Sequence, residues 1–208
     1  MNVAIIGTGN VGGALARTLS SAGHQIVVTS TTPEEAQALA NEVGGRSVRS
    51  NVEAIEAADI VIMAVPFDAI GSIVAEVGAT LEGKVVIDVT NRMSQDNPGS
   101  VVDGTSNAEQ VQSMVPGAYV VKAFNTVLAS RQADPKIADM PVDNFVAATD
   151  PAAKATVVDL VRSIGMRPID AGPLEAARVL EGMGALNIFL NMQGGTWQNA
   201  WKLVEPSG

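Results

Sequence analysis

The sequence contains no cysteine and only one histidine. The lack of cysteine excludes disulfide bonds, thiolate nucleophiles and zinc-thiolate sites, and a single histidine leaves little for a metal centre. Basic residues are also few: 13 lysines and arginines stand against 22 aspartates and glutamates, a formal net charge of −9. Because such a chain repels nucleic-acid phosphates and anionic membranes, we expect neither as a partner.

Long hydrophobic runs are lacking as well. The longest one is well short of the roughly 20 residues that cross a bilayer. No basic leader precedes the first apolar segment at Val3, so we expect a cytoplasmic protein. Hydrophobic residues nevertheless make up 47% of the 208 residues, which is enough for one main domain with a sizeable core.

The apolar residues occur in short β-type runs that alternate with amphipathic stretches. This order is typical of a doubly wound parallel α/β sheet, in which central strands are apolar on both faces. We predict strands at 3–6, 25–29, 60–65, 85–89, 119–124, 144–147 and 167–170. We predict helices at 11–22, 33–43, 69–78, 108–114 and 151–164.

Several helices have recognisable ends. Residues 32–35 match a capping box with proline at the first helical position, and Asp150 before Pro151 is a second N-cap. Gly23 and Gly165 are placed as C-terminal stops.

We expect a dinucleotide-binding domain over 1–172 and a small helical extension over 173–208. The extension contains a mostly apolar stretch at 174–193, more apolar than one surface helix needs. We therefore expect it to pack on the same domain or on a dimer partner. Residues 92–105 are predicted to form one long loop.

The clearest motif is the glycine loop at 7–12, Gly-Thr-Gly-Asn-Val-Gly. It follows the first predicted strand at once and opens the first helix, the context in which G-x-G-x-x-G indicates a Rossmann-type NAD(P) fold. Gly7 permits the tight turn, Gly9 lets the backbone approach the pyrophosphate, and Gly12 lets helix and strand pack closely. The helix N-terminus then faces the phosphate charge.

The end of the second strand, 29–32, bears on the choice between NADP and NAD. An acid there bonds the ribose 2′-hydroxyl and repels a 2′-phosphate. This tip carries hydroxyls and no acid, which favours NADP; it carries no arginine either, so NAD stays possible. Glu35 would weaken phosphate binding if it caps its own helix, and Arg46 or Arg49 would compensate.

Three further strand ends are expected to surround the nicotinamide. The third predicted strand ends at Val65 and Pro66, the fourth leads into Asn91 and the fifth into Asn125. Ligands in open α/β sheets bind outside the carboxyl ends of the strands.

No side chain is indicated as a catalytic acid or base. His24 lies at the sheet edge opposite the ligand crevice, and Tyr119 and Lys122 point to opposite faces of one strand. Asp88 is interpreted as structural, bonded to a nearby turn. Hydride transfer between two bound rings requires little beyond positioning, so this pattern favours ring-to-ring transfer over carbonyl reduction.

The chain resembles the NADPH-dependent reductases of the deazaflavin coenzyme F420, whose fold also looks like the cytosolic domain of membrane ferric reductases. The matching pieces are the glycine loop, residues 23–28, residues 121–126, and an Ala-Gly-Pro-Leu stretch at 171–174 followed by Arg178 and Glu181. The resemblance covers essentially the whole chain. The last piece is the most specific, because general dinucleotide folds lack it.

By this resemblance, residues 8–11 would hold the pyrophosphate, Ser30 and Thr31 the 2′-phosphate, and Ala123 would meet the nicotinamide through its backbone. The family has basic residues where this chain has Thr31 and Glu35, which bears on NADP selectivity. The predicted cofactor-binding residues are Gly7, Thr8, Gly9, Asn10, Val11, Gly12, Ser30, Thr31, Val65, Pro66, Asn91, Ala123 and Asn125.

The resemblance implies an NADP-dependent oxidoreductase with F420 or a flavin as second substrate, and a homodimer paired through C-terminal helices. The anionic tail of F420 would need positive charge; the candidates are Lys122, Arg92, Arg131 and Arg178. Lys122 and Arg178 fit equally well as a snorkelling strand lysine and a helix-surface arginine. Two alternatives stay open: a small hydroxy- or imino-acid dehydrogenase, and a non-catalytic NAD(P)-binding sensor or partner protein.

Overall fold

The computed structural model describes residues 1–93 and 104–204, so most of the loop predicted at 92–105 lies outside the described residues. Within the described chain, eight strands form one sheet. They are β1 Asn2–Ile6, β2 Gln25–Thr29, β3 Arg46–Ser47, β4 Ile60–Met63, β5 Val85–Asp88, β6 Tyr119–Lys122, β9 Asp143–Ala148 and β10 Arg167–Gly172. A separate hairpin pairs β7 Lys136–Ile137 with β8 Met140–Pro141.

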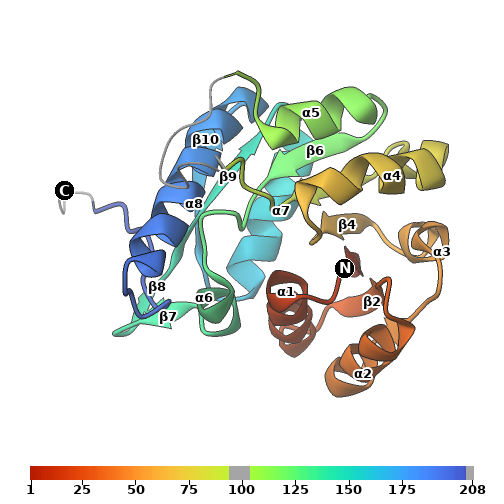
Figure 1. The fold of residues 1–208 in the computed structure, drawn as a ribbon, viewed down its shortest axis with the longest axis horizontal. Helices are drawn as coiled ribbons and strands as arrows, with labels where there is room; N and C mark the ends of the chain where they lie inside the picture. Colours follow the sequence, from red (N-terminus) through yellow and green to blue (C-terminus); the bar gives the residue numbers. More distant parts are fainter. Residues whose placement is uncertain (94–103, 205–208) are drawn as a thin grey trace.

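Helices cover both faces of the sheet (Figure 1). They are α1 Asn10–Ser21, α2 Pro33–Val43, α3 Asn51–Glu56, α4 Phe67–Val77, α5 Asn107–Met114, α6 Ala129–Ala133, α7 Pro151–Ser163 and α8 Ala177–Met192, with the 3-10 turns η1 Gly78–Leu81 and η2 Leu174–Ala176. On one face α1, α2 and α7 pack through side chains such as Leu15 and Val157. On the other face α3, α4 and α5 pack through side chains such as Ile70 and Val111.

The strand order is β10-β9-β6-β5-β4-β1-β2-β3. From β1, the chain adds β2 and β3 on one side of the sheet and then crosses over to add β4 and the later strands on the other side. β1 pairs in parallel with β2 on one side and with β4 on the other. The crevice outside the carboxyl ends at such a crossover is where these sheets bind ligands. The doubly wound α/β fold is confirmed, with one correction. β6 and β9 pair antiparallel, which makes the sheet mostly and not wholly parallel.

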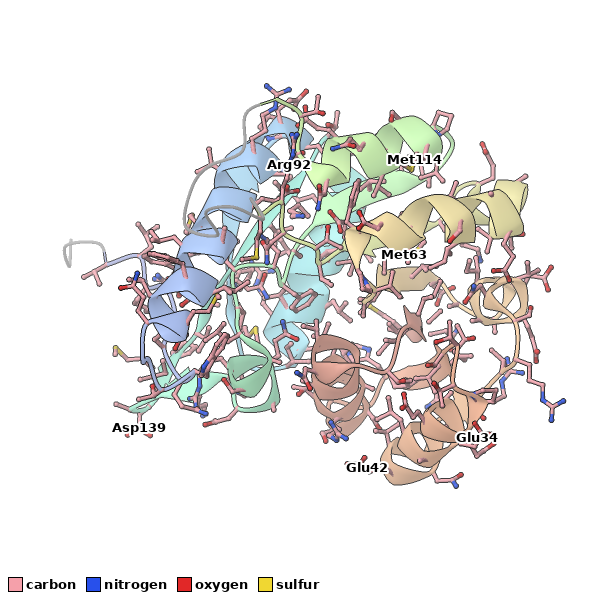
Figure 2. The ribbon with its side chains drawn as sticks, viewed as in Figure 1. Glu34, Glu42, Met63, Arg92, Met114 and Asp139 are labelled. Carbon is pink, nitrogen blue, oxygen red and sulfur yellow. The ribbon has the colours of Figure 1, made fainter. Side chains whose placement is uncertain are left out.

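Continuous apolar strands account for the core. Ile5, Ile62, Met63 and Ile87 come from the three central strands, and all are fully buried because helices cover both faces of the sheet. Met63 lies beneath α4 (Figure 2). Burying one such side chain stabilises the fold by about 1.5–3 kcal/mol relative to leaving it exposed.

Most of the helix-end signals are confirmed. Gly23 and Gly165 follow α1 and α7 with φ of 87° and 81°, a conformation that favours glycine. Asp150 accepts a 2.7 Å hydrogen bond from the first turn of α7. The capping box of α2 is wrong: Pro33 is at the first helical position, but in the described structure the Thr32 side chain makes no cap bond.

Three strands are shorter than predicted, and several short elements were not predicted. β4 stops at Met63, β5 at Asp88 and β6 at Lys122, short of the expected ends at 65, 89 and 124. Beyond β6, Phe124 has a φ of 63°, outside the extended region. Elements such as β3, α3 and α6 are too short to produce a detectable apolar period.

The chain ends in α8 and a segment that folds back beside it. α8 packs against η2 and α5, and Figure 1 shows it at the left, away from α2 and α3. The indole N–H of Trp201 donates a 3.2 Å hydrogen bond to the Met183 carbonyl, which ties the last segment to α8. Among the described residues, no helix combines the length and apolarity needed to cross a bilayer.

Candidate functional site

The glycine loop connects β1 to α1, and its three glycines differ in what surrounds them. Gly7 has a φ of 105° and donates a 2.9 Å bond to the Thr29 carbonyl. A Cβ on Gly7 would lie 2.3 Å from the Ala64 carbonyl oxygen, and one on Gly12 would lie 2.0 Å from the Gly7 carbonyl oxygen. A Cβ on Gly9 would meet none of the described residues within 4 Å. Gly7 and Gly12 therefore serve packing, while Gly9 leaves open space.

The N-terminus of α1 opens into that space. Gly9 is its N-cap and carries no side chain, and the first turn contains no acidic residue. The first helical backbone bond is donated by Gly13 to the Gly9 carbonyl at 2.8 Å, so the amides before Gly13 have no partner in the helix. These free amides, with the positive end of the helix dipole, form a local anion site.

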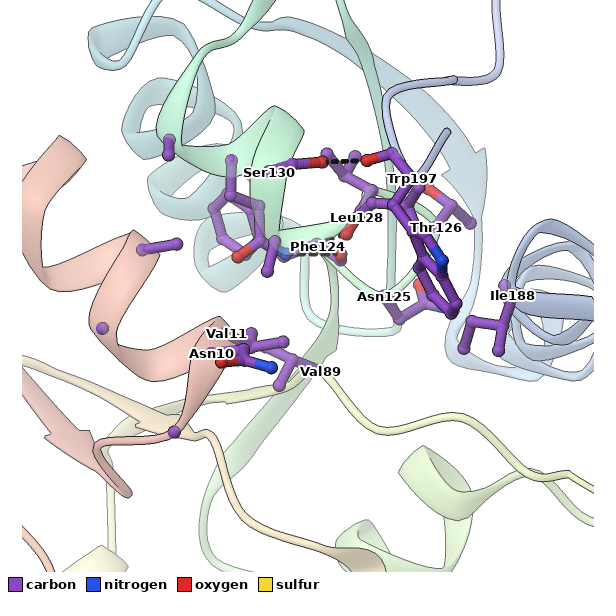
Figure 3. Close-up of a pocket in the computed structure, with 18 of the residues that line it drawn as sticks. Asn10, Val11, Val89, Phe124, Asn125, Thr126, Leu128, Ser130, Ile188 and Trp197 are labelled. Atoms are coloured by element: carbon purple, nitrogen blue, oxygen red, sulfur yellow. Dashed lines mark hydrogen bonds between the residues drawn. The ribbon is translucent and has the colours of Figure 1, made fainter. Parts of the chain in front are cut away.

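A cavity of about 900 Å³ extends from this helix end across the carboxyl ends of β5 and β6. Asn10 and Val11 border it on one side, and Ile188 and Trp197 border it on the other (Figure 3). A smaller hollow of about 290 Å³ shares Gly9 to Val11 and Asn91 with it and adds Val65 and Pro66. The predicted strand ends thus lie around one crevice.

Two asparagines face each other at the strand ends. The side-chain amide of Asn91 donates to the Asn125 carbonyl at 3.1 Å, and that of Asn125 donates to Asn91 Oδ1 at 2.8 Å and to the Leu180 carbonyl at 2.9 Å. Both side chains are thereby held in place. The Oδ1 of Asn125 is buried and has no hydrogen-bond partner among the described residues.

Phe124, between the predicted residues Ala123 and Asn125, lines the cavity, whereas Ala123 is fully buried in the core. The left-handed backbone conformation of Phe124 costs energy and is held by three hydrogen bonds. Its N–H donates to Asn144 Oδ1 at 3.0 Å, and its carbonyl accepts from Gln132 and Val127 at 3.1 Å each. Strand periodicity did not indicate this turn, since it depends on side chains from β9 and α6.

At the other end of the glycine loop, three polar side chains meet. Thr8 Oγ1 lies 3.1 Å from Ser30 Oγ and 3.2 Å from Glu35 Oε2, both hydrogen-bond distances. Thr31, next to Ser30, is exposed. Glu35 therefore reaches across to the loop and does not cap α2, contrary to the capping-box prediction.

Lys122 does not face the cavity, so its predicted role toward an anionic tail is wrong, and it does not snorkel either. It is fully buried, and its Nζ donates to Asp88 Oδ2 at 2.7 Å and to Glu181 Oε1 at 2.8 Å. Glu181 also accepts from the Asn107 N–H at 3.0 Å, at the start of α5. The interpretation of Asp88 as structural is confirmed, because its Oδ1 accepts from the Thr90 N–H at 2.9 Å.

The other basic candidates bind protein groups as well. Arg178 pairs with Glu109 through two bonds, and that guanidinium lowers the pKa of Glu109 to about 2. Arg131 pairs with Asp134 at 3.1 Å, and Arg92 donates to the Thr105 carbonyl. None of the three is among the described residues that line the large cavity.

His24 contacts the N-terminal amine and lies 2.8 Å from Ser163 Oγ, away from the cavity. Partial burial, together with the nearby N-terminal charge, lowers its pKa. In the described part of the chain, no group of three His, Asp or Glu side chains is placed to hold a metal ion. Apart from Arg17 and Glu35, the described residues that line the cavity are uncharged.

A doubly wound sheet with a strand–G-x-G-x-x-G–helix unit at its crevice defines a Rossmann-type dinucleotide fold. Residues 2–92 match the family described as NADP oxidoreductase, coenzyme F420-dependent. The F420-dependent NADP reductase of Methanocaldococcus jannaschii is 31% identical over 213 residues, with 93% of each protein covered. This chain belongs to that family of NADP-linked oxidoreductases.

Two further relatives agree with the family. Metalloreductase STEAP3 of Rattus norvegicus is 31% identical over 180 residues, and the match spans 86% of this chain but only 35% of that longer protein. The crystal structure of an Arthrobacter protein described as a candidate F420-dependent NADP reductase superimposes with a TM-score of 0.86 at 28% identity, covering 98% of this chain and 99% of the other.

Proposed function

We propose that this protein transfers a hydride between NADP(H) and the deazaflavin coenzyme F420. The observation that carries the proposal is the crevice itself, in which an uncapped helix N-terminus and the ends of β5 and β6 border one cavity. The residues that line this cavity run from Glu35 in α2 to Asn125 beyond β6. Family membership supports both the coenzyme and the reaction.

Each part of the crevice has a task in this proposal. Gly9 and the free amides of α1 hold the pyrophosphate, and Ser30 and Thr31 lie at the adenosine ribose. Asn91 and Asn125, which both line the cavity, lie beside the nicotinamide ring. When bound, the nicotinamide supplies or accepts the hydride. The chain contributes position and exclusion of water.

The second coenzyme ring would stack in the remaining space, between the strand ends and the C-terminal segment. Ile188 and Trp197 give this side of the cavity an apolar wall (Figure 3). Among the described residues that line the cavity, the charged side chains are Arg17 and Glu35, both at the α1 and α2 side. Because those described lining residues include no His, Lys, Tyr or Asp, the site favours ring-to-ring transfer over reduction of an imine or a carbonyl.

The direct experiment mixes the purified protein with NADPH and F420 under anaerobic conditions and follows the absorbance of both coenzymes. We expect NADPH oxidation with matching loss of oxidised F420. FMN and FAD are tested in parallel. If NADPH reduces a flavin but does not reduce F420, the flavin is the acceptor. If none of the three is reduced, the hydride-transfer proposal fails and a non-catalytic role takes its place.

We also propose that the protein is a homodimer paired through α8. Val179, Leu186 and Leu190 are spaced along one side of this helix and are 66%, 39% and 49% exposed. Met192 adds to the same exposed end of α8 at 58%. An apolar stripe of this kind is typical of a surface that a second protein covers.

A further inference from the structure

Glu35 is the one carboxylate among the described residues that line the large cavity. It is the third residue of α2, and it comes within 3.2 Å of Thr8 in the glycine loop. Thr8 in turn lies 3.1 Å from Ser30, the first residue after β2. A negative charge is thus held where the loop and the end of β2 meet.

This corner is where the adenosine ribose of a bound dinucleotide lies. β1 and β2 run in parallel with Ile6 opposite Thr29, so the loop and the strand end leave the sheet together. In folds of this type an acid at the end of the second strand bonds the ribose 2′-hydroxyl and repels a 2′-phosphate. Here the acid is supplied by α2 and reaches the same corner.

Among the described residues, no lysine or arginine forms an ion pair with Glu35. Arg17, the one cation among the described residues lining the cavity, donates two bonds to Glu42, at 2.6 and 2.9 Å. Arg46 pairs with Glu53 at 3.0 Å, and Arg49 lines a different hollow, beside Glu34. The compensation expected from Arg46 or Arg49 is therefore not present in the described structure.

Besides Glu35, α2 carries two further negative charges, at Glu34 and Glu42. The helix contains neither lysine nor arginine. Figure 2 shows Glu34 and Glu42 toward opposite ends of this helix, at the outer edge of the molecule. A phosphate dianion placed at the corner would meet this acidic helix without an arginine to bind it.

We propose that Glu35 is a specificity-determining residue that bonds the ribose 2′-hydroxyl of NADH and weakens the binding of the 2′-phosphate of NADPH, so that this protein accepts NADH as well as NADPH. The proposal rests on the proposed function, because it requires the dinucleotide to lie over the glycine loop. A dual preference for NADH and NADPH would distinguish this chain from relatives whose names mention NADP alone.

The test measures binding of two adenine fragments, ADP and 2′,5′-ADP, to the full chain by calorimetry, so that no turnover is needed. The wild type is expected to bind 2′,5′-ADP no more than about tenfold better than ADP. Glu35→Gln removes the charge and keeps the shape, and it is expected to raise the affinity ratio of 2′,5′-ADP to ADP by about tenfold.

Glu34→Gln is the matched control, because it removes the same charge from the neighbouring position, which borders the other hollow. It is expected to change the ratio by less than about twofold at physiological salt, where the Debye length is about 8 Å. Equal effects of the two variants would make the change a general charge effect and would overturn the role of Glu35.

Two other results are equally decisive. A wild type that prefers 2′,5′-ADP more than about a hundredfold would overturn the selectivity proposal and leave the hydride-transfer proposal standing. Failure of both fragments and of NADH and NADPH to bind would instead refute the dinucleotide site, and both proposals with it.

Discussion

At the scale of single residues, Gly9 and Gly12 carry different constraints although both belong to one motif. A side chain on Gly12 would collide with the Gly7 backbone, so that position is determined by folding. A side chain on Gly9 would extend into the open crevice, so that position is free in the described structure, and we propose that a bound ligand constrains it. Substitution can therefore separate the ligand site from the fold.

Gly9→Asp is expected to fold with a nearly unchanged melting temperature and to lose dinucleotide binding, because its carboxylate would lie against the pyrophosphate. Calorimetric titration with NADPH and a thermal melt check the two parts. Gly12→Ala is the contrasting variant and should melt well below the wild type. Unchanged NADPH affinity in Gly9→Asp would contradict the assignment of the loop.

Glu109 shows how one residue pair makes stability depend on pH. The hydrogen bonds from Arg178, opposed by burial and aided by Ser106, hold the pKa of Glu109 at about 2, against an ordinary value of 4.5. A depressed folded-state pKa contributes stability that is complete above the unfolded pKa and disappears as the pH falls through the folded pKa. The relevant window runs from about pH 4.5 down to about 2.

Glu109→Gln is therefore expected to lower the melting temperature near neutral pH and to differ less and less from the wild type as the pH falls through this window. Melts between pH 7 and 2.5 measure the difference. Glu53→Gln is a suitable comparison, since its pair with Arg46 is about half exposed and exposed pairs contribute little. If the difference in melting temperature between Glu109→Gln and the wild type stays constant with pH, the proposed contribution of the ionised Glu109–Arg178 pair is refuted.

At the scale of elements, the buried group around Lys122 joins parts that are distant in the sequence. Asp88 ends β5, Lys122 ends β6 and Glu181 lies in α8. The Nζ of Lys122 is 2.7 Å from Asp88 Oδ2 and 2.8 Å from Glu181 Oε1. Glu181 also binds the first turn of α5. This contact places α8 beside the strand ends, where Leu180 and Gly184 meet the asparagines of the crevice.

Lys122→Met is expected to destabilise the protein by about 3–5 kcal/mol, because it leaves two carboxylates buried without their cation. Chemical denaturation measures the free energy of unfolding. Lys136→Met, at an exposed position in β7, should change it by less than about 0.5 kcal/mol. If both variants are equally stable, Lys122 does not hold α8 to the sheet.

At the scale of the whole molecule, the described structure leaves an apolar face of α8 exposed. Light scattering on the purified protein is expected to give the mass of a dimer at micromolar concentration. Leu186→Glu combined with Leu190→Glu should give monomers, since each places a charge in the apolar stripe. Asp159→Gln, on the surface of α7, is the control and should leave the mass unchanged. A monomeric wild type would contradict the proposed pairing.

The sequence was most informative where local rules apply. The glycine loop, the apolar strands and the N-cap at Asp150 each depend on a few neighbouring residues. The loop and the N-cap lie where they were predicted, and β4 begins where it was predicted although it ends two residues early. The predicted roles of the four basic residues were less successful. Residue type alone does not tell whether a lysine or arginine meets a ligand or a carboxylate from another part of the chain.

The sequence by itself determined the doubly wound fold and the position of the glycine loop, because backbone conformation and apolar periodicity are set within short stretches. Only the tertiary structure decided what the charged residues do. Lys122 meets carboxylates 34 and 59 positions away, and Glu35 meets Thr8 from 27 positions away. Charges act through space, and the distances between them are set only when strands and helices pack.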